Sequence, residues 1–70
     1  MKFEKGKVYT HKNMLDMVIF VQDTYHDFDK DAIYLKIRWY NRRGMDINTE
    51  EIIRIVKSEL GNWYEWEGAA

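Results

Sequence analysis

The stretch AIYLKIRWYNRRG, residues 32–44, decides the fold of this 70-residue chain. Apolar and polar side chains alternate along it with a period of two, which predicts a long strand with one buried side and one solvent-facing side. The apolar positions are Ile33, Leu35, Ile37 and Trp39. The polar positions are Tyr34, Lys36, Arg38, Tyr40 and Arg42, and Gly44 is expected to end the strand. β-branched and aromatic residues suit a pleated surface, and the apolar side requires other elements to cover it.

The segments on both sides of this strand also have β character. Apolar, β-branched and aromatic residues are concentrated in three of them, so we expect further strands at residues 8–11, 16–25 and 63–67. Turns or loops are expected between the strands, at residues 12–13, 26–31 and 43–46. We interpret residues 2–7 as a charged lead-in that ends near Gly6.

Residues 48–60 fit two different structures. As a helix, the segment would have Asn48 as its N-cap, Glu51 three residues later as in a capping box, and Gly61 as its stop. As a strand, residues 52–56 offer four β-branched side chains in five positions, followed by a tight turn at residues 58–62. Helix propensity differs by only tenths of a kcal/mol per residue between these residue types, so it does not decide the matter. We favour the strand, because the neighbouring strands need a partner to complete a closed sheet.

Short strands joined by tight turns predict a mainly β fold, a small SH3-like antiparallel barrel of about five strands. Closure of the sheet would remove exposed edges, which otherwise invite aggregation. The alternatives are an OB-like barrel and an α+β fold with a helix at residues 49–60. A chain of 70 residues supports one hydrophobic core, so residues 1–70 are expected to form a single domain. The sequence has no cysteine, and its three tryptophans supply much of the area available for burial.

The composition argues against several classes of protein. The net charge is −1 with both signs distributed along the chain, whereas a domain dedicated to binding a phosphate backbone is usually strongly basic. The longest uninterrupted apolar run, residues 17–21, is too short to cross a bilayer, and no apolar run follows the N-terminal charges as it would in a signal peptide. We therefore expect a cytoplasmic protein without membrane contact, and the absence of cysteine fits a reducing compartment.

No set of residues predicts catalysis, a cofactor or a metal site. Ser58 is the only serine and has no glycine elbow, and the four glycines are scattered rather than gathered in a phosphate-binding loop. Residues 27–31 have the Asp spacing that opens a calcium loop, but Ala32 stands where that loop requires glycine. His11 and His26 could meet, with Asp23 and Asp27, across the first two strands, although exposed histidines at strand ends are the more common case. We expect no catalytic residue, no metal and no cofactor.

The polar side of the central strand is the most function-like surface in the sequence. It combines basic and aromatic residues, namely Tyr34, Lys36, Arg38, Tyr40, Arg42 and Arg43. Single-stranded nucleic-acid platforms use such a combination, with cations along the phosphates and rings stacked on bases. The simpler interpretation is a solvent face whose cations pair with acids on adjacent strands, and the acidic residues needed for this are plentiful.

Three segments carry a resemblance to a known group of proteins: residues 6–13, 37–44 and 62–64. Their sequences, GKVYTHKN, IRWYNRRG and NWY, resemble those of small, uncharacterised SH3-like β-barrel proteins from tailed bacteriophages of the marine type. The resemblance spans most of the chain. It implies a barrel and a setting in the host cytoplasm, and it implies no catalytic residue.

These observations lead to two main functional hypotheses, and a third possibility is a minor structural protein of a virion. The first is a non-catalytic, phage-borne module that binds protein, either a partner or itself as a homo-oligomer. The alternative is a nucleic-acid-binding barrel that uses the basic and aromatic side of the central strand. The two differ in salt dependence, because phosphate contacts weaken steeply as salt rises whereas an apolar protein interface barely responds.

Overall fold

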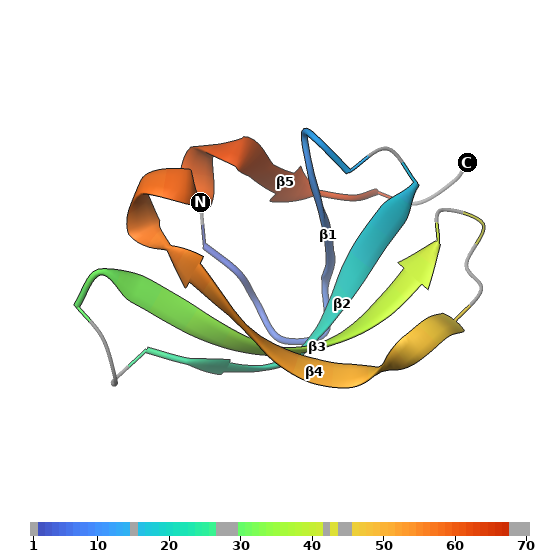
Figure 1. Ribbon diagram of the computed structural model, residues 1–70, viewed down its shortest axis with the longest axis horizontal. Coiled ribbons are helices and arrows are strands. Elements are labelled where there is room, and N and C mark those ends of the chain that lie inside the picture. Colours follow the sequence, from blue (N-terminus) through green and yellow to red (C-terminus); the bar gives the residue numbers. More distant parts are fainter. Residues whose placement is uncertain (1, 15, 27–29, 42, 44–45, 68–70) are drawn as a thin grey trace.

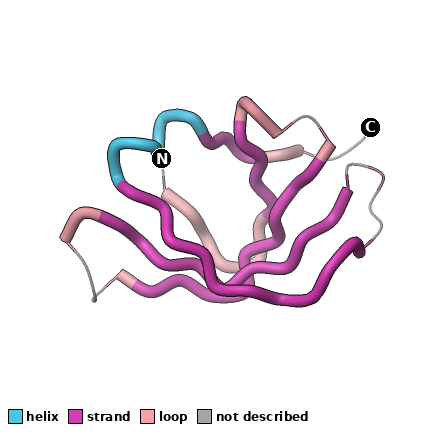
Figure 2. Tube along the Cα trace, in the orientation of Figure 1, coloured by secondary structure: helices cyan, strands magenta, loops and turns pink. Residues whose placement is uncertain are grey.

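Five antiparallel strands form one sheet in the order β4-β3-β2-β1-β5 (Figure 1). The structure is a computed structural model that describes residues 2–14, 16–26, 30–41, 43 and 46–67, with only the backbone described for residues 46–49. The strands are β1 (Val8–His11), β2 (Met17–Tyr25), β3 (Ala32–Asn41), β4 (Asp46–Val56) and β5 (Trp63–Glu65). A 3₁₀ segment, η1 (Lys57–Asn62), joins the last two strands (Figure 2). The prediction of a mainly β fold with about five antiparallel strands is confirmed.

The central strand has the two sides that its alternating pattern predicts. β3 pairs with β2 on one side and with β4 on the other. Its residues Leu35 and Ile37 are completely buried, whereas Lys36 between them is half-exposed. Ile37 lies opposite Val21 of β2, and Leu35 lies opposite Ile53 of β4. The apolar side of β3 is therefore the floor of the core, and its polar side faces outward.

Residues 48–56 lie in a strand and residues 57–60 in a 3₁₀ segment, so the prediction of a strand over residues 52–56 is correct and the alternative of a helix over residues 49–60 is wrong. β4 runs to Val56 and η1 follows it. A helix would have placed Ile52 and Ile53 on one buried face, but the strand separates them. Ile52 is 62% exposed, and Ile53 packs against the core. β-branched side chains fit well on the pleated surface of a sheet. The pairing of β4 with β3 therefore outweighs the helix-capping signals.

The expectation of a closed sheet is wrong. β4 and β5 are the two ends of the strand order, and no hydrogen-bonded ladder joins them in the part of the chain that the structure describes. β5 has only three residues and pairs with β1, while η1 spans the gap between β4 and β5. Leu60 and Trp63 pack on the core from this side, so side chains cover the gap in place of a backbone ladder. The sheet curls so that η1 and β5 lie opposite β4 (Figure 1).

The N-terminal segment is part of the core rather than a charged lead-in. Phe3 is 2% exposed, and its ring lies edge-on to the rings of Tyr9, at 4.7 Å, and Trp63, at 5.7 Å. The backbone N–H of Gly6 donates to the carbonyl of Val21, and Gly6 has a φ of 89°, which residues with a side chain rarely adopt. The segment thus fills the inside of the curled sheet and is fastened to β2.

Two expected strands are shorter in the structure. The central strand ends at Asn41, and the last strand ends at Glu65 rather than at residue 67. Gly44, the expected end of the central strand, lies outside the described residues. Within the portion of the chain that is described, the structure contains no helix with the length and apolar character needed to cross a membrane.

Candidate functional site

Four of the six predicted contact residues lie on the outer side of β3. Tyr34, Lys36, Arg38 and Tyr40 all alternate with the core residues, and each is half-buried. We call these four residues the basic strand face. Arg43 does not extend it, because it lies in the turn after β3, where its N–H donates to Oδ1 of Asn41 at 2.9 Å. Arg42 lies outside the described residues.

A carboxylate on the neighbouring strand forms ion pairs with both cations of the basic strand face. Glu50 of β4 faces Arg38 in the register, and its Oε2 lies 3.9 Å from Nη2 of Arg38. Its other oxygen, Oε1, lies 3.6 Å from Nζ of Lys36. All three side chains are exposed by a third or more, so these pairs contribute little to stability. They do reduce the positive charge available to a phosphate, and the geometry favours the simpler interpretation of this surface.

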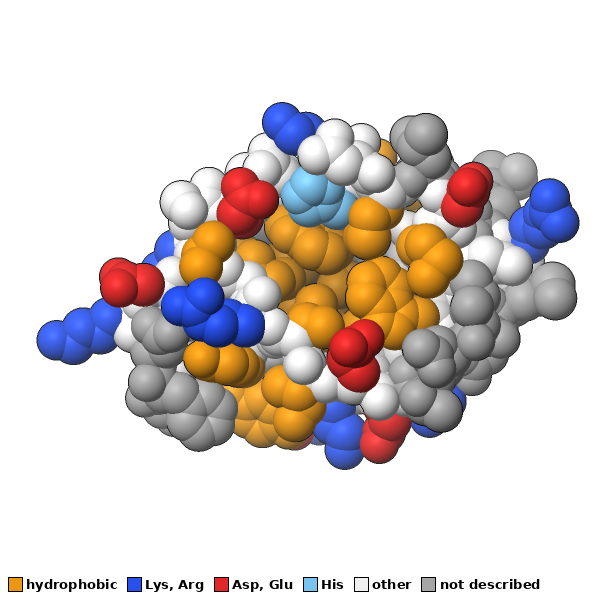
Figure 3. All heavy atoms as spheres, viewed as in Figure 1, with side chains coloured by type: hydrophobic (Ala, Val, Ile, Leu, Met, Phe, Trp, Pro, Cys, Tyr) orange, Lys and Arg blue, Asp and Glu red, His pale blue; other side chains and the backbone are white. Residues whose placement is uncertain are grey.

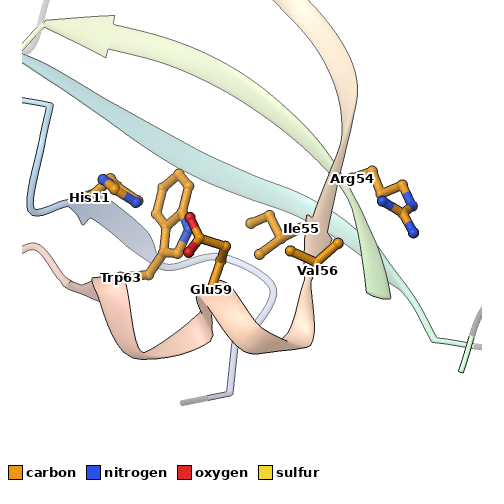
Figure 4. Close-up of a pocket in the computed structure, with 6 residues that line it drawn as sticks. All are labelled: His11, Arg54, Ile55, Val56, Glu59 and Trp63. Carbon is orange, nitrogen blue, oxygen red and sulfur yellow. The ribbon is translucent and has the colours of Figure 1, made fainter. Parts of the chain in front are cut away.

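A hollow opens on the side of the molecule where the sheet is not closed. It has a volume of about 200 Å³. Its walls come from β1, β4, η1 and β5, and they are formed by His11, Arg54, Ile55, Val56, Glu59 and Trp63 (Figure 4). In Figure 3 apolar side chains gather in the middle of this face, and charged side chains surround them.

Aromatic packing supports one wall of the hollow. The rings of His11 and Trp63 lie edge to face at 5.0 Å, and Trp63 also rests on Phe3. Nδ1 of His11 accepts a hydrogen bond from the N–H of Asn13 at 3.0 Å. Ile55 forms the opposite wall, and Glu59 lies in front of Trp63 (Figure 4). The sequence alone does not reveal this hollow, because the residues that line it come from segments that are far apart in the chain.

The edge of β4 borders the same side of the molecule. Among the strands that the structure describes, β4 pairs only with β3, so one of its two edges has no strand beside it. Ile52 lies in this strand and is the most exposed large hydrophobic residue described. Glu50 and Arg54, two positions away on either side, are on the same side of the strand as Ile52. Ile52 is thus an exposed apolar residue that lies between side chains of opposite charge on an edge strand.

The structure does not bring together the residues of the other candidate sites, as far as it describes them. β1 and β2 are antiparallel, so His11 and His26 lie toward opposite ends of β2 and cannot share a metal ion. Within the described ranges, no three His, Asp or Glu side chains gather into a group that could hold a metal. Residues 27–29 of the possible calcium loop lie outside the described residues, and Ser58 is exposed in η1.

Comparisons with known proteins give no match. No protein-family model matches the chain, and neither a curated protein nor a solved structure matches it.

Proposed function

We propose that this protein is a non-catalytic interaction module that acts by associating with protein, in the first place with itself. The observation that carries the proposal is the exposure of Ile52, at 62%, in a strand with one unpaired edge. Burial of an apolar side chain of this size is favourable by about 1.5–3 kcal/mol. A partner that covers β4 would gain this burial and would also satisfy the unpaired backbone groups of the edge.

The small size of the domain supports the same proposal. A 70-residue chain buries a smaller fraction of its surface than a larger domain, and association is a common way to bury more. The chain has no disulfide to compensate for this. Residues of β4 also line the apolar hollow, so a partner at the edge of β4 would lie beside the hollow.

We infer that the sheet belongs to the SH3-like class rather than the OB-like class. In support, β1 lies between β2 and β5, and a 3₁₀ turn connects β4 to β5. The phage origin that the sequence resemblance implies stays a prediction, as does the cytoplasmic setting.

Nucleic-acid binding is the alternative function. It would use the basic strand face, and the pairing of Lys36 and Arg38 with Glu50 makes it the weaker proposal. Each cation would have to exchange a protein carboxylate for a phosphate.

Sedimentation velocity over a range of protein concentrations tests the proposed function. We expect a weak dimer with a Kd on the order of tens of µM, because a single pair of edge strands buries less area than a standard stable interface. A strict monomer up to about 1 mM, where association would contribute only about 4 kcal/mol, would count against the proposal.

A further inference from the structure

The unpaired edge of β4 is long for a strand at the end of a sheet. β4 has eleven residues, whereas β5 at the other end of the sheet has three. Natural edge strands are usually kept short, interrupted by proline, or protected by a lysine at their centre. β4 contains neither proline nor lysine, and Ile52 lies next to its central residue, Glu51. The strand is therefore long enough to pair with another strand, and its charged residues Glu50, Glu51 and Arg54 decide which pairing is favourable.

Symmetry limits how β4 could pair with β4 of a second copy. Residues that lie directly opposite each other in an antiparallel pair point to the same side of the sheet. A two-fold axis perpendicular to the sheet therefore passes through one residue position, which faces its own counterpart. Every other residue faces the one that is equally far from the axis in the opposite direction. Each choice of central residue thus fixes all other pairs.

The charges of β4 favour Ile52 as the central residue. With Ile52 on the axis, Glu50 of each copy faces Arg54 of the other, which gives two cross-strand pairs of opposite charge. With Glu51 on the axis, two carboxylates would face each other, which is unfavourable. With Ile53 on the axis, Glu50 would face Val56 and the charge pairs would be lost. Only the register centred on Ile52 matches both charge and hydrophobicity.

We infer that two copies of this chain associate through antiparallel pairing of their β4 strands, with Ile52 of each copy facing Ile52 of the other. This inference rests on the proposed self-association and adds its geometry. The pairing runs from residue 48 to residue 56 in both chains, so it stays within β4 and ends where η1 begins. It joins the two five-stranded sheets into one continuous sheet of ten strands.

The inferred pairing extends an arrangement that is already present in one copy. Glu50 lies in β4 and already contacts Lys36 and Arg38 of β3 on one side. The unpaired edge of β4 is on its other side. In the dimer Arg54 of the second copy approaches Glu50 from that edge. The carboxylate is then surrounded by cations from two chains, while the exposed side chain of Ile52 becomes buried against its counterpart.

A single engineered cysteine tests the register. The chain has no cysteine of its own, so Ile52→Cys would introduce one thiol per copy. Directly opposite residues in an antiparallel pair have Cβ atoms about 4.5–5.5 Å apart, which small adjustments bring within the range of a disulfide. Under mild oxidation we expect Ile52→Cys to form a covalent dimer at least about tenfold faster than Tyr64→Cys, whose position is also exposed but lies on β5. Equal rates for the two variants would overturn the inference.

A charge-reversal experiment tests the same register without a covalent bond. Glu50→Lys alone places two cations opposite each other at both pairs, and Arg54→Glu alone places two carboxylates opposite each other, so each variant should be more monomeric than the wild type. An equimolar mixture of the two restores opposite charges at both pairs, and we expect a heterodimer with about the wild-type affinity. A mixture that stays monomeric would contradict the register.

The two experiments separate the inference from the proposed function. If the wild type is a strict monomer, self-association and the register both fail. If the wild type dimerises, but the cysteine and charge variants behave like their controls, self-association stands and the register centred on Ile52 is wrong. Circular dichroism of each variant serves as the control for folding. We expect the fold to be retained, because the substituted positions are exposed.

Discussion

Nη2 of Arg38 lies 3.9 Å from Oε2 of Glu50, so this cation of the basic strand face is paired with an acid from the neighbouring strand. The same carboxylate reaches Lys36 through its second oxygen. This relationship has two consequences. It lowers the positive charge that β3 offers to a polyanion, and it places Glu50 at the border between β3 and the unpaired edge of β4.

The first prediction concerns nucleic acid. Removal of the carboxylate charge in Glu50→Gln leaves Lys36 and Arg38 without this ion-pair partner and should raise the affinity for single-stranded oligonucleotides. We expect no measurable binding by the wild type at physiological salt and weak, salt-sensitive binding by the variant. Fluorescence anisotropy of labelled oligonucleotides at two salt concentrations measures both.

A matched variant completes this test. In Glu50→Gln/Arg38→Gln the gain should disappear, because one of the two released cations is absent. Tight, salt-sensitive binding by the wild type that is lost in Arg38→Gln would support the nucleic-acid hypothesis and contradict the preferred one.

The second prediction concerns the N-terminal segment. Phe3 is buried between Tyr9 and Trp63, so Phe3→Ala should lower the free energy of unfolding by about 3–5 kcal/mol. The total free energy of unfolding of such a domain is only about 5–15 kcal/mol, so this loss is a large share of it. Tryptophan fluorescence during urea unfolding measures it. Phe3→Leu should lose much less, and an Ala variant as stable as the wild type would show that the segment is not part of the core.

The third prediction compares two leucines. Leu35 is completely buried in β3, whereas Leu60 in η1 is only half-buried. Leu35→Ala should therefore cost about 2–5 kcal/mol, and Leu60→Ala clearly less, because less apolar area and a smaller cavity are involved. Chemical denaturation of both variants provides the comparison. Equal losses would mean that the gap beside η1 is as tightly packed as the centre of the sheet.

The fourth prediction concerns the buried hydroxyl of Thr10. Its Oγ1 donates to the carbonyl of Met17 at 2.9 Å, and the residue has no exposed surface. Thr10→Val keeps the shape and removes the donor, so the free energy of unfolding should fall by about 1–3 kcal/mol. Urea denaturation measures the loss, and an unchanged midpoint would show that the carbonyl of Met17 is satisfied in another way.

Local pattern was sufficient to predict the central strand, because the alternation in β3 has the period of a strand. For residues 48–60 the local pattern fitted a helix and a strand alike, and the strand was favoured because the neighbouring strands needed a partner. The strand order was not predicted, because short connections favour only neighbouring antiparallel pairs and the pairing of β1 with β5 joins segments far apart in the chain. The basic strand face was predicted correctly as one side of β3, since a period of two determines sides directly.

Features that depend on distant contacts could not be predicted from the sequence. Phe3 stands alone among charged residues, and nothing local shows that its ring lies against Trp63, sixty residues later in the chain. The open side of the sheet depends on the path of η1, and the exposure of Ile52 depends on which strand ends the sheet. The pairing of Glu50 with Arg38 follows from the β3–β4 register, which the sequence pattern leaves free by any even number of residues.

Amide hydrogen exchange in β4, measured by NMR at low and high protein concentration, tests the central claim most directly. In an edge strand alternate amides point toward the neighbouring strand and away from it. If two copies pair through β4, the outward amides between residues 48 and 56 exchange more slowly as the concentration rises, while those of β5 do not change. If exchange in β4 is the same at both concentrations, the edge of β4 is not where this protein associates.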